Sequence, residues 1–465
     1  MKCKLHPVIT PFFVIMFFGI GALVSSCKKT KDTPAPPPPT DSTTLASKAK
    51  DSALLDARDF YLWYNQIPSG FNAQSYKDPG EIMTAIRSYS NEPGFGIVDK
   101  WSFGVLKSDW NQLSGGIGTV NNTSASGDFG MSVFFRVEGD LRVKLVEKAS
   151  PAGLAGIERG WRITKINGNT NIKTSNSDFI VNAVFYSATS TFTFVKPDGT
   201  SVDMTLNAAT YPQQTVYLDS VYNIGTKKIG YMVMNSFLGD TSQINRDLQR
   251  VMSNFATKNV SDIVIDLRYN GGGYVSLQQK LADYLAPSST NNQLMMKETF
   301  NDKHQNYNTT LYFTKTGPLN PNHVFFIVSP STASASELLI NNLKPYMTVK
   351  LIGPGNTDGK PVGFFPLSAG DWYVFPVSFR SSNSANSGSY FNGFTPDAIV
   401  ADGLDKNWGD TSESCLAKAI KYITTGSFTA QALEVYKQDP VITSANKTLD
   451  QSSFKGMIDV RGMKQ

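Results

Sequence analysis

Apolar and polar residues follow two different patterns between residues 209 and 425. Short apolar runs, typical of buried strands, are separated by longer segments in which apolar residues recur every three or four positions, as on one face of a helix. Because the two patterns alternate, we expect an α/β core whose strands are at least partly parallel. The predicted strands are 228–237, 262–267, 324–329 and 348–353, and the predicted helices are 241–256, 274–285 and 336–343.

A different pattern occupies residues 111–208, where Gly and Ser are frequent and short segments alternate apolar and polar residues. This period of two predicts strands, and the Asn167-Gly168 pair is a strong hairpin signal. A short helix is predicted to begin near Pro151. A β-rich unit is therefore expected between the core and the helical, aromatic residues 48–110. Its predicted strands are 131–135, 142–146, 192–195 and 202–206.

The N-terminus has the plan of a secretion signal. Lys2 and Lys4 precede an apolar run over residues 8–24, and small residues lead to Cys27. The run is about 17 residues long, at the short limit for a membrane span, which leaves an uncleaved anchor as the alternative. Residues 24–27 also resemble a bacterial lipobox, in which the cysteine is lipidated. This resemblance implies that Cys27 tethers the chain to a membrane outside the cytoplasm, facing the periplasm or lying on the outer-membrane surface.

The pattern divides the whole chain into six segments. After the signal peptide at 1–27, a Pro-rich linker at 28–47 favours extended polyproline II and acts as a spacer. The tail after residue 425 is polar, with a helix predicted only near 430–436. The remaining segments are the helical region 48–110, the β-rich unit 111–208, the α/β core 209–425 and the tail 426–465.

Composition excludes several kinds of site. The net charge of +5 is too weak a field to argue for nucleic-acid binding. Three cysteines form no disulfide framework and no His/Cys cluster has metal spacing, so we expect neither a metal nor another cofactor. Cys415 lies in a helical pattern, which favours a buried structural thiol. Because His304 and His323 are the only histidines after the signal segment, a serine hydrolase would need another base.

Two segments of the β-rich unit carry a recognisable motif. Ser150-Pro151-Ala152-Gly153-Leu154-Ala155-Gly156 and Gly160-Trp161-Arg162-Ile163 through Gly168 resemble a PDZ domain, although Trp161 stands where Asp is usual. A PDZ domain adds an extended peptide, often a C-terminus, to a sheet edge. The alternative is a small packing domain without a ligand. The resemblance implies peptide binding at Phe129, Gly130, Met131 and Ser132.

A serine-rich turn joins the predicted strand at 324–329 to the next helix. A serine at such a turn faces the N–H groups of the helix start, which favour a developing negative charge. Ser334-Ala335-Ser336-Glu337 is also a capping box, S-x-x-E, so a purely structural role explains the same residues. The two roles are compatible, because a nucleophile at a helix start is also a cap.

Two further segments complete a set of reactive groups. Lys360 has apolar flanks and could act as a base if burial lowered its pKa by about three units; otherwise it is a solvated surface charge. The run Asn270-Gly271-Gly272-Gly273 follows a buried strand. Its backbone N–H groups could donate to an oxyanion, or it could simply form a tight turn.

Taken in order, these motifs resemble the C-terminal processing (tail-specific) peptidases, the S41 serine peptidases. The motifs are Ile-Gly-Tyr at 229–231, Asp-Leu-Arg-x-Asn-Gly-Gly-Gly at 266–273, Ser-x-Ala-Ser-Ala-Ser-Glu at 331–337, Gly-Lys at 359–360 and Thr-Pro-Asp at 395–397. The lipobox and Asp99-Lys100-Trp101-Ser102-Phe103 look like the lipoprotein members of Bacteroidetes-type bacteria. The family fold is a crotonase-like α/β core with an inserted PDZ domain.

By this resemblance Ser334 is the nucleophile, Lys360 its general base, and the oxyanion hole comes from the N–H groups of Ala335 and of Gly271 or Gly272. The loop before Lys360 is one residue longer than usual. Lys344-Pro345 replaces a supporting acid or amide, which leaves Asn341 or Asn342 for that role.

The expected function is that of an envelope-anchored serine endopeptidase whose PDZ domain recognises protein or peptide substrates. One alternative is a catalytically silent peptide-binding or scaffolding lipoprotein, and another is a hydrolase of non-peptide esters. A Ser-His enzyme is disfavoured, because His323 begins the strand whose far end leads to the serine. The sequence carries no signal for the oligomeric state.

Overall fold

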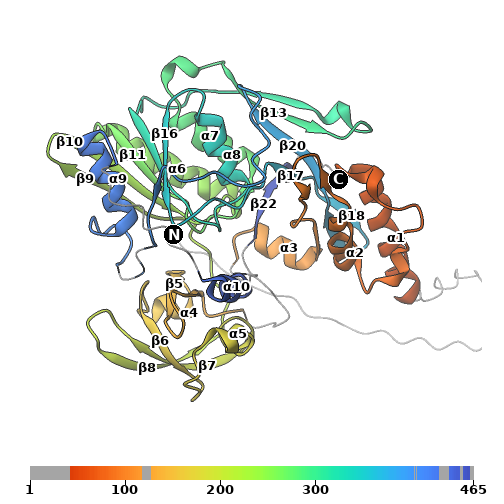
Figure 1. Ribbon diagram of the computed structural model, residues 1–465, viewed down its shortest axis with the longest axis horizontal. Helices are drawn as coiled ribbons and strands as arrows, with labels where there is room; N and C mark the ends of the chain where they lie inside the picture. Colours follow the sequence, from red (N-terminus) through yellow and green to blue (C-terminus); the bar gives the residue numbers. More distant parts are fainter. Residues whose placement is uncertain are drawn as a thin grey trace, which may run out of the picture. The chain divides into compact units, whose positions relative to one another are not determined.

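A six-stranded sheet forms the centre of the α/β core, in the order β21-β16-β15-β11-β10-β9 (Figure 1). The five strands from β10 to β21 are parallel, and β9 runs antiparallel to β10. The expected partly parallel α/β core is thus confirmed. The strands are β9 (Val216–Ile224), β10 (Lys227–Met234), β11 (Asp262–Asp266), β15 (His323–Ile327), β16 (Thr348–Gly353) and β21 (Ala398–Ile399).

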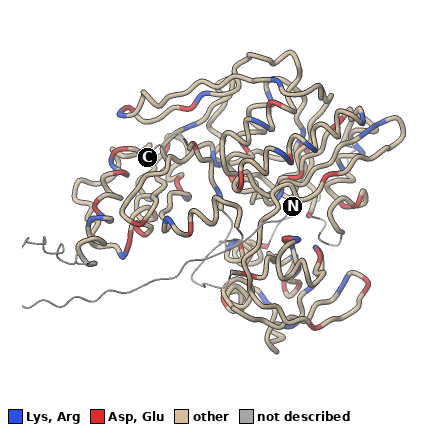
Figure 2. The backbone as a smooth tube through the Cα atoms, turned by 180° about the vertical axis from the view of Figure 1, so that it is seen from behind, with Lys and Arg blue, Asp and Glu red and all other residues tan. Residues whose placement is uncertain are grey.

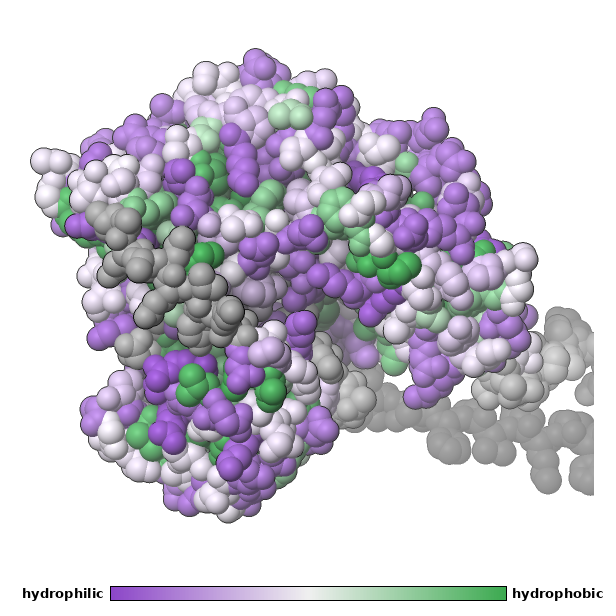
Figure 3. Space-filling view, in the orientation of Figure 1, coloured by the Kyte–Doolittle hydropathy of each residue, from purple (hydrophilic) through white to green (hydrophobic). Residues whose placement is uncertain are grey.

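The computed structural model describes residues 42–117, 127–402, 404, 406–428, 439–450 and 454–460. The expected signal peptide, Cys27 and the helix predicted near 430–436 lie outside these residues. None of the helices in the described ranges is long and apolar enough to cross a membrane. Lys and Arg are interspersed with Asp and Glu along the trace (Figure 2). On the face drawn in Figure 3, hydrophilic side chains surround scattered apolar ones.

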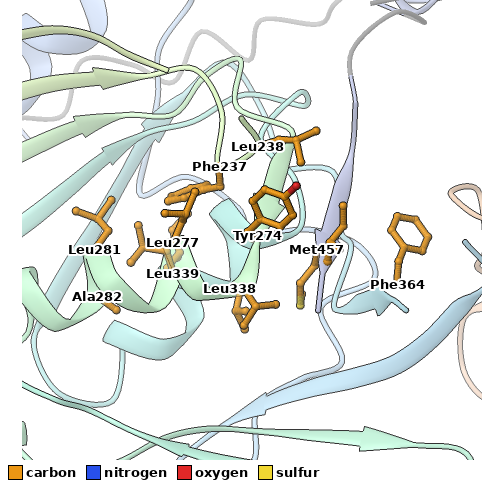
Figure 4. Packing of buried hydrophobic residues seen from close by; sticks show 14 of the residues in the cluster. Phe237, Leu238, Tyr274, Leu277, Leu281, Ala282, Leu338, Leu339, Phe364 and Met457 are labelled. Atoms are coloured by element: carbon orange, nitrogen blue, oxygen red, sulfur yellow. The ribbon is translucent and has the colours of Figure 1, made fainter. Parts of the chain in front are cut away.

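Helices cover both faces of the central sheet. Ile263 and Ile265 of β11 belong to one apolar cluster, whereas Val264 between them belongs to another. This alternation places α6 (Thr241–Thr257), α7 (Val275–Leu285) and α8 (Ala335–Leu343) against one face and α9 (Ser414–Thr425) against the other. Figure 4 shows α7 and α8 side chains meeting in the first cluster. The predicted helices are present, with ends that differ by one residue.

A second six-stranded sheet was not predicted. Its order is β12-β22-β17-β20-β13-β14. Strands of three residues, such as β12, are too short to leave a readable pattern. This sheet places the glycine run at 270–273 and the strand that follows Lys360 on either side of β22. Its strands are β12 (Gly272–Tyr274), β13 (Leu294–Phe300), β14 (Thr309–Tyr312), β17 (Val362–Phe364), β20 (Val377–Asn383) and β22 (Gly456–Ile458).

The N-terminal region packs into the main core. Tyr61, Trp63 and Trp110 are buried in the first apolar cluster, so the aromatic residues form core as expected. The first helix begins at Ser42, inside the expected linker at 28–47. The region also contains a strand, β3, which joins a small sheet in the order β18-β19-β3. The elements are α1 (Ser42–Phe60), α2 (Pro79–Ile86), β3 (Phe103–Leu106), α3 (Lys107–Ser114), β18 (Leu367–Ala369) and β19 (Trp372–Phe375).

Residues 127–208 form the β-rich domain, an antiparallel sheet in the order β4-β5-β6-β7-β8 with its own apolar cluster. Asn167 and Gly168 have the positive φ angles of a tight turn. However, the turn closes only a single bridge from Ile166 to Asn169, and β6 pairs instead with β7, so the predicted hairpin is wrong. The elements are β4 (Met131–Phe135), β5 (Leu141–Val146), α4 (Pro151–Leu154), β6 (Arg162–Ile166), α5 (Ser177–Val181), β7 (Thr189–Val195) and β8 (Ser201–Asn207).

The C-terminal segment contributes more structure than its pattern indicated. The helix α10 (Pro440–Leu449) packs against β4 and α5 of the β-rich domain. The strand β22 then pairs in parallel with both β12 and β17. Residues distant in sequence therefore complete both the β-rich domain and the second sheet.

Candidate active site

Ser334 occupies the turn between β15 and α8. Its φ of +61° and ψ of −111° lie outside the regions that non-glycine residues usually adopt, which marks a strained position held by its surroundings. Glu337 supplies its half of the predicted capping box, because its carboxylate accepts the Ser334 N–H at 2.8 Å. The Ser334 side chain is fully buried, and its Oγ has no hydrogen-bond partner among the described residues.

Two unused N–H groups lie near this turn. The N–H of Ala335, first residue of α8, has no intrahelical acceptor and lies at the positive end of the helix. A Cβ added to Gly272 would stand 3.0 Å from this nitrogen, so the glycine run approaches the helix start closely. The Gly272 N–H donates to Asn270 Oδ1 at 2.9 Å. The Gly271 N–H has no acceptor within the described ranges. Gly271 and Ala335 therefore offer the free donors.

Lys360 is buried beneath two aromatic rings. Its Nζ lies 3.4 Å from the centroid of the Phe364 ring and 5.5 Å from that of Trp101. The side chain is fully buried, and Nζ has no hydrogen-bond partner within the described part of the chain. Burial holds the pKa of Lys360 well below its usual value, although the Asp99 and Asp358 carboxylates oppose part of this shift. These surroundings favour the neutral amine.

The Glu337 carboxylate joins the turn that contains Ser334, here called the serine turn, to the loop that leads to Lys360, here called the lysine loop. Its Oε2 accepts the backbone N–H groups of Ser334 and Lys360, both at 2.8 Å. Its Oε1 accepts the Thr357 hydroxyl at 2.5 Å and the Gly359 N–H at 2.7 Å. Because both backbone nitrogens contact the same oxygen, Glu337 holds Ser334 and Lys360 close together. Burial, with a contribution from Asp358, raises the pKa of Glu337 to about 7.

The segment Asp99-Lys100-Trp101-Ser102-Phe103 lies over the lysine loop. The Trp101 indole N–H donates to Asp358 Oδ2 at 2.8 Å. The Asp358 N–H donates to the carbonyl of Thr332, in the serine turn, at 2.9 Å. Sequence reasoning noted this segment but did not connect it, or Thr357, Asp358 and Phe364, with the site. No local pattern indicates a contact between residues so far apart in the chain.

Two of the motifs that suggested a peptidase, Ile-Gly-Tyr at 229–231 and Asp-Leu-Arg at 266–268, have structural roles. Arg268 is buried and pairs with Asp266 at 2.7 Å, Glu413 at 2.9 Å and Asp402 at 2.7 Å. The Tyr231 hydroxyl donates to Asp266 at 2.9 Å. This ion network, here called the Arg268 network, anchors the strand end from which the glycine run starts.

Several residues considered from the sequence lie elsewhere. His323, at the start of β15, has its Nδ1 2.7 Å from Asp262, and His304 pairs with Asp59. Neither histidine therefore contacts Ser334. Asn341 and Asn342 donate to Ser387 and Met296 rather than to Lys360. Cys415 is buried, as predicted. Within the described ranges, no group of three or more His, Cys, Asp or Glu side chains could hold a metal ion.

The four residues predicted to bind peptide lie at the start of β4 in the β-rich domain. Phe129 is buried, and the Gly130 N–H donates to Asp128 Oδ1 at 2.7 Å. A cavity of about 170 Å³ reaches from Gly130, Met131 and Ser132 to Gly271. The predicted peptide loop and the glycine run thus border one space.

Comparison with known proteins adds family information to this geometry. Residues 228–400 match the model of peptidase family S41. Over 244 residues the chain is 28% identical to a Staphylococcus aureus protein named "Probable CtpA-like serine protease", which covers 52% of this chain and 46% of that protein. Over 211 residues it is 27% identical to the carboxy-terminal processing protease CtpB of Bacillus subtilis, covering 44% of this chain and 41% of that one. The matched region spans less than half the length of each relative.

A solved structure matches over a longer range. The crystal structure of a Bacteroides fragilis protein assigned to the S41 proteases superposes with a TM-score of 0.65 and 25% identity. The match covers 81% of this chain and 97% of that one. The sequence and structure matches thus agree that the α/β region of this chain, residues 228–400, is similar to peptidase family S41.

Proposed function

We propose that this protein is a serine endopeptidase that hydrolyses peptide bonds with a Ser334-Lys360 dyad. One observation carries the proposal. The Ser334 hydroxyl and the Lys360 amine are both buried without hydrogen-bond partners among the described residues, and one carboxylate, that of Glu337, holds their backbones together. A nucleophile, a base with a lowered pKa and free N–H donors are what acyl transfer requires.

The reaction proceeds through an acyl-enzyme. Neutral Lys360 takes the proton from Ser334 as Oγ attacks the peptide carbonyl carbon, and the N–H groups of Gly271 and Ala335 hold the oxyanion. The lysine proton passes to the leaving nitrogen as the C–N bond breaks. Water then attacks the ester and gives its proton to Lys360, which returns it to Ser334 as the C–O bond breaks.

Substrate capture is the proposed task of the β-rich domain, as a PDZ domain. Its edge strand β4 starts at Met131, and the cavity beside this strand extends to Gly271. A peptide added at such an edge gains main-chain hydrogen bonds. The shared cavity supports delivery of that peptide from Phe129, Gly130, Met131 and Ser132 towards the dyad.

Anchoring to the cell envelope is a separate part of the proposal. The lipobox-like residues 24–27 would be processed so that Cys27 carries acyl chains, with residues 28–41 as a spacer. Radiolabelled palmitate incorporated by cells that express the full chain, and not by cells with Cys27→Ser, is the expected result.

The peptidase test compares the wild type with Ser334→Ala and Lys360→Ala on an unfolded protein substrate. We expect both variants to lose at least ~10³-fold in kcat, because each lacks one member of the dyad. Ser336→Ala is the matched control, since Ser336 Oγ bonds the Asn270 carbonyl and takes no part in the proposed chemistry. Equal cleavage by Ser334→Ala and the wild type would refute the assignment of the nucleophile.

One observation favours a second function, a silent peptide-binding lipoprotein. Ser334 and Lys360 are each 0% exposed, so the described conformation does not admit a substrate. This function predicts peptide binding without Ser334-dependent hydrolysis under any condition. Hydrolysis that appears only when a peptide ligand is present would favour the peptidase.

A further inference from the structure

The helix α10 lies where an incoming peptide would meet the β-rich domain. β4 is an edge strand of the five-stranded sheet, and extended peptides join sheets at such edges. In this chain α10 packs against β4, α5 and the turn at Thr174–Asn176. The surface between β4 and α5, here called the β4/α5 groove, is therefore covered by a segment from the other end of the chain.

The apolar face of α10 completes the core of the β-rich domain. Ile442, Ala445 and Leu449 recur with the spacing of one helix face, and all three are buried in the apolar cluster of this domain. Ser444 and Lys447 point to solvent. The β4/α5 groove thus fits an amphipathic helix.

Asn446 pairs with the backbone of one residue, Phe135, at the open edge of β4. Its Oδ1 accepts the Phe135 N–H at 2.8 Å, and its Nδ2 donates to the Phe135 carbonyl at 2.9 Å. A residue of an added antiparallel strand would form the same two bonds with Phe135. The side-chain amide of Asn446 therefore stands in for the backbone of a bound peptide.

We propose that α10 is a resident internal ligand of the β4/α5 groove, and that any peptide binding there must first displace it. The binding surface is thus matched to a helix with apolar residues at the spacing of Ile442, Ala445 and Leu449. The groove and its occupant do not depend on peptide hydrolysis, so this proposal can fail or succeed independently of the peptidase assignment.

The C-terminal segment also connects the groove to the candidate active site. Asp450, directly after α10, accepts Lys144 Nζ at 2.7 Å and the Ser331 hydroxyl at 2.9 Å. The Gly456 N–H then donates to the Gly271 carbonyl at 3.0 Å, and the Asp459 N–H to the Phe364 carbonyl at 3.2 Å. The C-terminal segment that contains α10 thus contacts the serine turn, the glycine run and the lysine strand.

The test uses a labelled synthetic peptide of residues 439–450 and the full chain carrying Ser334→Ala, so that no cleavage interferes. In this background, Ala445→Asp places a carboxylate in the buried face of α10 and should release the helix. Ser444→Asp is the matched control, with the same charge on the adjacent exposed position. We expect the peptide to bind the Ala445→Asp protein at least ~10-fold more tightly than the Ser334→Ala protein or its Ser444→Asp variant. In those two proteins the tethered helix competes with the peptide at an effective concentration near ~1 mM.

Hydrogen exchange at the Phe135 amide reports independently whether the groove is open. Equal peptide affinity for all three proteins would show that α10 does not occupy the groove. If the Ala445→Asp protein does not bind the peptide although its Phe135 amide exchanges rapidly, the open groove is not a peptide-binding site. If Ala445→Asp fails to fold, Asn446→Ala replaces it in both measurements, with the same expected order of affinities.

Discussion

At the scale of single residues, the surroundings of Lys360 determine whether it can act as a base. An ammonium group in this position would be stripped of water and would have no hydrogen-bond acceptor in the part of the chain that the structure describes. The Phe364 ring compensates only weakly, because a cation–π contact returns about 0.5–2 kcal/mol. The neutral amine therefore prevails at lower pH than it does on a solvated lysine.

This environment predicts the pH dependence of activity. As pH falls through the lowered pKa of Lys360, the amine takes up a proton and kcat/KM should decline. Phe364→Ala admits water, raises that pKa and should move the declining limb to higher pH. The measurement is kcat/KM against pH for the wild type, Phe364→Ala and the control Phe365→Ala, whose buried ring stacks on Phe60 instead. An identical displacement in both variants would contradict the assigned role of Phe364.

At the scale of elements, α8 and the loop before β17 are held together by Glu337. The sequence suggested Glu337 only as half of a capping box, and that half is present. Its contacts with Thr357, Gly359 and Lys360 were not predictable, because they depend on how the two sheets fold against each other. The same reason applies to Phe364 and Trp101. The strands of the central sheet, by contrast, were predictable, because burial on both faces leaves continuous apolar runs.

Glu337→Gln tests this link between elements. A glutamine keeps one acceptor oxygen but presents an amide NH₂ towards two of the donors, so the loop shifts away from the serine. We expect kcat to fall about 10²-fold, the scale of a 1 Å misplacement, with a smaller change in KM. Asp283→Asn is the control, because it removes a buried carboxylate that accepts the Thr314 N–H away from the site. If Glu337→Gln lowers the free energy of unfolding but leaves kcat unchanged, Glu337 stabilises the fold without positioning the catalytic groups.

At the scale of the whole molecule, the Arg268 network ties the central sheet to the C-terminal part of the core. Arg268 contacts Asp402 and Glu413, and Arg159 of the β-rich domain also pairs with Asp402. Burial alone would raise the pKa of Glu413, but the arginine holds it below the usual value. The motif Asp-Leu-Arg was read from the sequence as a family signature. Its function as a joint between regions became apparent only in three dimensions.

Arg268→Met should leave Asp266 and Glu413 without their arginine partner, whereas Asp402 keeps its ion pair with Arg159. We expect the free energy of unfolding, measured by urea denaturation, to fall by about 3–5 kcal/mol. The matched control is Arg250→Met, because Arg250 forms an exposed ion pair with Asp219, for which about 0–1 kcal/mol is expected. Similar losses in the two variants would show that the buried network contributes no more than a surface pair.

The position of β22 has a consequence for the order of events in synthesis. This strand lies between β12 and β17, and it comes from nearly the last described residues of the chain. A ribosome releases the polypeptide from the N-terminus, and domains fold as they emerge. The sheet that joins the glycine run to the lysine strand is therefore incomplete until Gly456–Ile458 have been synthesised. During synthesis, Ser334 and Lys360 are therefore already part of the polypeptide before the sheet that supports them is complete.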